Sequence, residues 1–176
     1  LRDLGGHTPL LSVQHLLSKG LFDEALRLAH LLLQAGCDPN DLNRDSRSLL
    51  SFSVVHGDRT ADLTRLLLNH GAKVWVENVD EDDTKETAFT RFLQSAMRSY
   101  GLESSEETLN LLSHAMQSEN PNRMKNHVTS TMMKLGQSSS VMFGPLFVEL
   151  KFRLAPFWSR PPQLKDLCLQ KIRQSV

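Results

Sequence analysis

The chain has 176 residues, which is enough for one domain, or for one repeat array with an appendage. Lysine plus arginine equals aspartate plus glutamate at 20 each, so we expect neither a nucleic acid nor a membrane surface as the main partner. No apolar run reaches transmembrane length, and no signal peptide opens the sequence. Leucine dominates the apolar residues and β-branched runs are few, which predicts an all-α fold.

Two cysteines, Cys37 and Cys168, are too few for a disulfide framework, and we expect both to be reduced thiols of an intracellular protein. We therefore expect a cytoplasmic location, with the nucleus as a second compartment. Because the first residue is leucine, we also expect the sequence to be a fragment of a longer chain.

Apolar residues recur at helical spacing along most of the chain, and turn residues divide the expected helices into four pairs. Thr8, Ser48 and Thr87 open successive pairs at intervals of 40 and 39 residues. The expected repeats lie near residues 3–40, 43–75 and 80–118, with an atypical one at 122–154. The expected helices cover residues 9–18, 22–34, 88–98, 105–117, 124–135 and 145–154, with two more that end near Val55 and carry the leucines of 63–68.

Local signals mark the ends of these helices. Thr8 is placed to cap the first helix, Pro9 suits its first position, and Gly20 ends it. Asp23 is the expected N-cap of the second helix, and Gly36 is the expected C-cap. Near the C-terminus we expect a loop over residues 136–140, and a linker over residues 155–160 whose Phe157 and Trp158 pack on the last repeat.

The opening of the chain has the order Asp, two residues, Gly, one residue, Thr-Pro-Leu, which resembles the start of an ankyrin repeat. Residues 32–40 and 69–74 resemble the segment that closes such a repeat. The resemblance covers residues 1–74 by motif and continues to about residue 154 by spacing. It implies an ankyrin-repeat solenoid of three to four helix pairs over residues 1–154, which binds other proteins.

A short amphipathic stripe follows two prolines within residues 155–176. Four apolar residues fall at spacings of three, one and four, which places them on one face of a helix. One interpretation is a terminal helix docked on its own domain, and the other is a helix offered to the groove of a partner. The stripe consists of Leu164, Leu167, Cys168 and Ile172.

Leu164, Cys168 and Ile172, after a proline, resemble the elongin-binding box that opens a SOCS box. Ankyrin-like repeats followed by such a box resemble the ankyrin-repeat and SOCS-box family. This resemblance implies that the leucine enters a pocket of elongin C with the cysteine beside it, so elongin C and elongin B are the expected partners. It also implies a cullin, cullin-5 rather than cullin-2, and a protein substrate on the repeats.

The function implied by the resemblance is that of a non-catalytic substrate adaptor in an elongin-cullin-RING ubiquitin ligase. The Leu-Pro-rich stretch that binds the cullin in this family does not follow the box here, so the choice of cullin stays open. The alternative is an ankyrin-repeat scaffold or regulator with no ligase role, in which the last helix is only a cap.

The candidate substrate-binding residues are Trp75 and the acidic run after it, with Asp80, Glu81 and Asp82. They would form a finger beside the concave side of the array and engage a basic ligand, whereas the alternative is a solvated loop. The seven histidines show no metal-ligand spacing with a cysteine or carboxylate, and we expect them to be structural. The sequence shows no phosphate loop and no activated nucleophile, so we expect no catalytic site, metal or cofactor.

Overall fold

The structure is a computed structural model that describes residues 8–75, 87–98, 102–119, 121–138 and 143–159. These residues are helical apart from their connecting turns, and none of them forms a strand. The all-α prediction is therefore confirmed for this part of the chain. The elements are η1 (Leu11–Val13), α1 (Gln14–Ser18), α2 (Phe22–Gln34), α3 (Leu49–Ser53), η2 (Val54–Thr60), α4 (Ala61–Asn69), α5 (Ala88–Arg98), α6 (Glu106–Glu119), α7 (Pro121–Ser138) and α8 (Phe143–Ser159).

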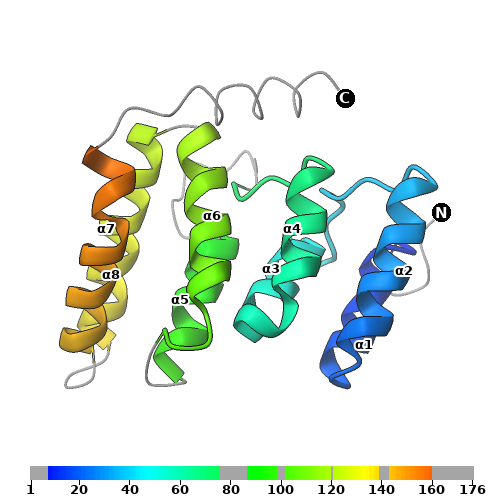
Figure 1. The fold of residues 1–176 in the computed structure, drawn as a ribbon, viewed down its shortest axis with the longest axis horizontal. Helices are drawn as coiled ribbons and strands as arrows, with labels where there is room; N and C mark the ends of the chain where they lie inside the picture. Colours follow the sequence, from blue (N-terminus) through cyan, green and yellow to red (C-terminus); the bar gives the residue numbers. More distant parts are fainter. Residues whose placement is uncertain (1–7, 76–86, 99–101, 120, 139–142, 160–176) are drawn as a thin grey trace.

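The helices stand in pairs that follow one another side by side in chain order (Figure 1). Along one row α1 contacts α3 and α3 contacts α5, while along the other row α2 contacts α4, α4 contacts α6 and α6 contacts α8. Helices α7 and α8 contact each other and complete the stack, and η2 contacts both α5 and α6. The odd-numbered helices thus form one row and the even-numbered helices the other.

The second, third and fourth pairs are related by the same register. The guanidinium Nε of Arg91 in α5 donates to the carbonyl of Ser51 in α3, 40 residues earlier, at 3.0 Å. Thr87, just before α5, and His127 in α7 are also 40 residues apart, and their side chains lie 2.9 Å apart. Gln117 in α6 donates to the carbonyl of Phe157 in α8 at 2.8 Å, again across 40 residues. The third pair therefore sits on the second, and the fourth on the third, at the predicted spacing. The first and second pairs are joined at a shorter offset, since Asn40 donates to the carbonyl of Gly71, 31 residues later.

Two helices of the second row end in the same turn. Gly36 after α2 and Gly71 after α4 both have φ of 85°, a left-handed conformation that glycine adopts without strain. The amide of Cys37 donates to the carbonyl of Leu32, and the amide of Ala72 donates to that of Leu67, both at 3.0 Å. This is the Schellman arrangement of a helix C-terminus, so the predicted stops at these helices are confirmed.

A single apolar core runs through the stack from α1 to α8. Each helix contributes apolar side chains from the stripe that faces its neighbours, mainly leucine, alanine and phenylalanine, with methionine and valine in α7. Burying one such leucine or phenylalanine stabilises the fold by about 1.5–3 kcal/mol. The largest fully buried side chains are Phe89, Phe92, Leu10, Leu11, Leu17, Leu49, Leu50, Leu63, Leu67, Leu93, Leu102 and Leu109.

Helix limits agree with the prediction at α2 and α5, whose ends are those expected from the sequence, and differ elsewhere. The first helix begins as the 3-10 turn η1, with the Thr8 hydroxyl accepting from the Leu11 amide at 3.5 Å. The N-cap of α2 is Leu21, and Asp23 lies in the first turn instead of capping it. Asp23 therefore acts through its negative charge near the helix N-terminus.

The last two helices are longer than expected. Helix α7 extends to Ser138, so the first part of the predicted loop over residues 136–140 is helical. Helix α8 extends to Ser159 through Pro156, so the predicted linker is helical over residues 155–159. Phe157 holds this last turn in place, because its ring lies 4.9 Å from the ring of His114 in α6 and its carbonyl accepts from Gln117. These contacts of Phe157 are with α6 of the third repeat, and not with the atypical last repeat on which packing was expected. The side chain of Trp158 lies outside what the structure describes.

Candidate functional site

Most of the predicted site residues lie outside the part of the chain that the structure describes. This holds for the stripe residues Leu164, Leu167, Cys168 and Ile172, and for the acidic residues Asp80, Glu81 and Asp82. Trp75 is the one predicted site residue within the described ranges. The candidate site is therefore built outward from Trp75.

Trp75 lies after the Gly71 turn, and its side chain is only 4% exposed. Its ring is packed against His127 of α7, with ring centroids 4.9 Å apart and planes nearly perpendicular. The guanidinium of Arg123 also lies over the Trp75 ring, 4.7 Å from the ring centroid. Trp75 thus joins the end of the second pair to the fourth pair, and it is not presented to a protein partner.

His127 connects Trp75 to the threonines at the start of α5. Its Nε2 lies 2.9 Å from the hydroxyl of Thr87 and 3.4 Å from that of Thr90. The hydroxyl of Thr131, one turn further along α7, also lies 3.4 Å from Nε2. The Thr87 hydroxyl in turn accepts from the amide of Thr90 at 3.1 Å, which caps the first turn of α5.

One polar atom of this cluster has no partner among the described residues. The indole Nε1 of Trp75 is buried, and no described group accepts a hydrogen bond from it. An indole N–H is a donor only, and leaving it unsatisfied costs about 1–3 kcal/mol. The sequence predicted Trp75 as a site residue, but it did not predict His127, Thr87 or Arg123 as members of a site. Thr87 and His127 are 40 residues apart, which is the predicted interval between helix pairs, and this spacing is the sequence signal from which their contact could be predicted.

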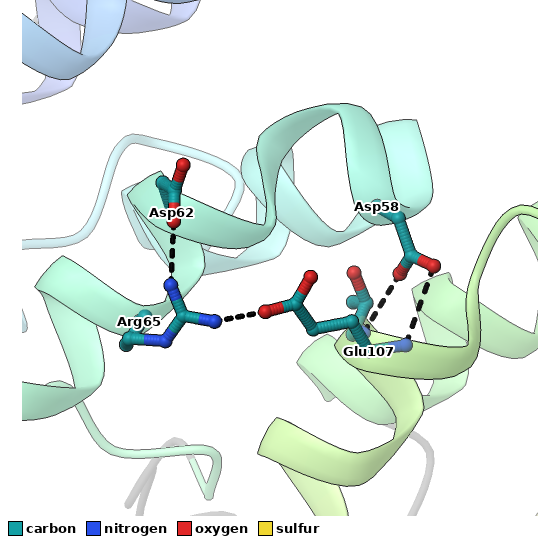
Figure 2. A network of polar contacts seen from close by, with 5 residues as sticks. Asp58, Asp62, Arg65 and Glu107 are labelled. Carbon is teal, nitrogen blue, oxygen red and sulfur yellow. Dashed lines mark hydrogen bonds and ion pairs between the residues drawn. The ribbon is translucent and has the colours of Figure 1, made fainter.

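A second polar network joins η2 and α4 to α6 (Figure 2). The Asp58 carboxylate accepts from the amide of Thr108 at 2.8 Å and from that of Glu107 at 3.3 Å, so it caps the N-terminus of α6. The Asp58 amide donates to the carbonyl of Ser104 at 2.9 Å, which fixes the entry to the same helix. Arg65 of α4 lies between Asp62 and Glu107 and pairs with both.

Gly57 allows this close approach of η2 to the start of α6. Its φ of 60° is in the left-handed region, and a Cβ at this position would lie 2.5 Å from the carbonyl oxygen of Ser104. Both the backbone conformation and the lack of space therefore require glycine here.

Arginines clamp successive helix pairs together. Arg59 lies over the ring of Phe22 at 4.8 Å, and Arg91 lies over the ring of Phe52 at 5.6 Å. In each case the arginine belongs to the later pair and the aromatic ring to the earlier one, as with Arg123 and Trp75. A contact of this kind contributes about 0.5–1 kcal/mol at an exposed site. These arginines stabilise the stack of helix pairs.

No group of three or more histidine, cysteine, aspartate or glutamate side chains within the described ranges is arranged to hold a metal ion. The helices of the same ranges include none that is long and apolar enough to cross a membrane. Comparison with known proteins gave no matching family model, no matching curated protein and no matching solved structure.

Proposed function

We propose that the chain is a substrate adaptor of an elongin-cullin-RING ubiquitin ligase, with an ankyrin-type array for the substrate and a C-terminal box for elongins B and C. The main support is the 40-residue register of the second, third and fourth helix pairs, together with the Schellman turn that recurs at Gly36 and Gly71. A stack of this kind presents a continuous surface to another protein and requires no catalytic group of its own.

The ankyrin assignment rests on the order of the elements within each unit. A turn, a short first helix, a second helix and a left-handed glycine follow one another in the first two units. An ankyrin unit has about 33 residues. The register of the second, third and fourth pairs is 40 residues, and the added length lies in the links, such as the 3-10 segment η2 between α3 and α4.

The elongin assignment rests on the sequence of the box. Leu164 is the proposed anchor in the apolar pocket of elongin C, with Leu167, Cys168 and Ile172 completing the buried strip. A buried leucine contributes about 1.5–3 kcal/mol to such an interface. Cysteine suits the position beside it, because its side chain is small, soft and apolar. Ubiquitin transfer itself would be carried out by the cullin-bound subunits.

Co-expression with elongin B and elongin C, followed by size-exclusion chromatography, tests this proposal. We expect a stoichiometric ternary complex with the wild-type chain, and loss of the complex when Leu164→Ala is combined with Cys168→Ala. The matched control combines Lys165→Ala with Asp166→Ala, which lie off the apolar face and leave the net charge unchanged. Equal elongin binding by both double variants would refute the box assignment, provided that circular dichroism shows the same helix content.

The second candidate is a scaffold without a ligase role, in which the stripe packs on its own array. It is favoured by two apolar side chains one turn apart on α8, Val148 and Phe152, which are 66% and 82% exposed. A terminal helix could cover them. A stable monomer that does not bind the elongins in the co-expression experiment would identify the protein as a scaffold of this second kind.

A further inference from the structure

Helices α7 and α8 stand at one end of the described stack, and α8 has exposed apolar side chains there (Figure 1). Val148 and Phe152, one turn apart, are 66% and 82% exposed. The other side of α8 is apolar as well, because Leu146, Leu150 and Leu154 are buried in the core. A helix that is apolar on both sides normally has neighbours on both sides. The exposed side of α8 therefore has the composition of a contact surface.

Helical spacing shows which way these side chains of α8 face. Arg153 and Phe157 point to α6, since Arg153 pairs with a glutamate of α6 and the ring of Phe157 lies against a histidine of α6. Successive residues of an α-helix are about 100° apart around its axis. Val148 therefore lies about 140–180° from these two side chains, Lys151 about 120–160° and Phe152 about 100–140°. All three face away from α6, toward the open end of the stack.

A lysine of α7 faces the same end. Arg123 and His127 point back toward the preceding units, since both pack on the ring of Trp75. Lys125 is two residues from each of them, so its side chain lies about 160° away around the helix axis. Lys125 and Lys151 are both exposed, and no described residue forms an ion pair with either.

These apolar and cationic side chains form one surface, which we call the end face. It consists of Val148, Lys151 and Phe152 of α8 and Lys125 of α7. No free carboxylate lies beside it, because α7 contains no aspartate or glutamate within its bounds and Glu149, the one carboxylate of α8, pairs with Arg153 at 2.9 Å. The end face is therefore apolar and positively charged, and it attracts an apolar partner that carries carboxylates.

Charge disfavours the other occupants of the end face. Residues 160–176 contain four cations and one carboxylate, so they would bring further positive charge to the two lysines. An isologous contact between two copies joins the same surface of both subunits and would oppose the lysines of one copy to those of the other. Stable attachment to an anionic membrane needs a larger set of cations or a lipid anchor.

We propose that the end face binds an amphipathic helix of a protein partner that carries aspartate or glutamate beside its apolar stripe. The stripe would cover Val148 and Phe152, and the carboxylates would pair with Lys125 and Lys151. The partner helix would thus stack on the fourth pair as a further unit of the array would. This inference does not depend on the elongin assignment, which rests on residues 164–172.

Fluorescence anisotropy with the full chain tests this inference. The probe is a fluorescein-labelled 18-residue peptide with leucine at alternating intervals of three and four, and with glutamate and alanine at the other positions. A shuffled peptide of the same composition, without that periodicity, should bind about tenfold more weakly. Phe152→Ser should also weaken binding of the periodic peptide about tenfold. The matched control is Leu31→Ser on α2, where the leucine is 63% exposed, and it should leave binding unchanged.

A second pair of variants tests the charges. Combining Lys125→Gln with Lys151→Gln should weaken binding about fivefold, the effect of removing two partly screened charges. The control combines Lys19→Gln with Arg27→Gln, two exposed cations of the first helix pair with the same change in net charge. Equal weakening by the test variant and its control, in either pair of variants, would overturn the proposal.

The other occupants give different results, each of which would overturn the proposal. Tighter peptide binding by the full chain with Leu164→Ser and Ile172→Ser would show that residues 160–176 cover the end face. Self-association in sedimentation that Phe152→Ser removes would identify a second copy. Tighter binding to vesicles of phosphatidylcholine and phosphatidylserine than to the peptide would identify a membrane surface. Elongin binding is measured separately by co-expression, so its failure and the failure of peptide binding are distinguishable.

Discussion

At the scale of single residues, His56 has the clearest chemical signature in the described part of the chain. It lies in η2, half-buried, with its ring 5.2 Å from that of Phe22. Burial is the main cause that lowers the pKa of His56 below its ordinary value of 6.5, and the positive charge of Arg59 lowers the pKa further. The folded chain therefore holds this imidazole in its neutral form at a pH where the unfolded chain begins to protonate it.

The sign of the resulting pH dependence follows from proton binding. Between the lowered pKa of the folded state and about 6.5, the unfolded state binds more protons, so stability falls as the pH falls through this window. Above this pH window, His56 is neutral in both the folded and the unfolded state and does not change the free energy of unfolding. We expect urea unfolding to show a smaller loss of stability between pH 7.5 and 5.5 for His56→Gln than for the wild type. His30→Gln, an exposed position on α2, is the control, and an unchanged pH dependence in His56→Gln would contradict this assignment.

At the scale of one element, the start of α6 depends on a residue from a different helix pair. Asp58 lies 49 and 50 residues before the two amides that it caps, so no local pattern reveals it. The same carboxylate offsets the partial positive charge of the helix N-terminus. This cap is what joins the second pair to the third on the side of the even-numbered row.

Replacing Asp58 by alanine tests the cap. We expect Asp58→Ala to lower the free energy of unfolding by about 1–2 kcal/mol, because two amides of α6 lose their acceptor. The control is Asp62→Ala, since Asp62 is exposed and pairs only with Arg65 among the contacts described, and it should cost about 0.5 kcal/mol or less. Amide hydrogen exchange at Thr108 should accelerate in the first variant alone. Equal stability of the two variants would show that the cap is not important.

At the scale of the whole molecule, the stack is held together by contacts between neighbouring helix pairs. Its stability therefore depends on the residue at which the last helix ends. The sequence placed the end of the array at residue 154, whereas α8 continues to Ser159 and returns contacts to α6. Phe157 is the residue that makes them, through its ring on His114 and its carbonyl on Gln117.

Two truncations separate the array from the box. A chain ending after Ser159 should keep the melting temperature of the array and lose elongin binding. A chain ending after Leu154 also loses the Phe157 contacts, and a loss of about 2 kcal/mol would lower the melting temperature by roughly 4–8 °C in a chain of this size. Thermal unfolding followed by circular dichroism measures both. Equal melting temperatures for the two truncations would mean that the last turn of α8 does not stabilise the stack.

The sequence by itself determined the helices and their repeat. Thr87, which opens the third unit, predicted α5 at its observed ends, and Gly36 and Gly71 predicted the turns after α2 and α4, because a helix-opening threonine and a left-handed glycine are local signals. The all-helical class followed from the same local signals.

The contacts that join one helix pair to another were decided only by the tertiary structure. It buried Trp75 beside His127, placed the Asp58 cap on α6 and carried α8 through Pro156. Each of these depends on residues about 40–50 positions apart, or on a neighbouring helix that outweighs a local preference. Packing, and not local propensity, selects such contacts, which is why Trp75 looked from the sequence like an exposed finger.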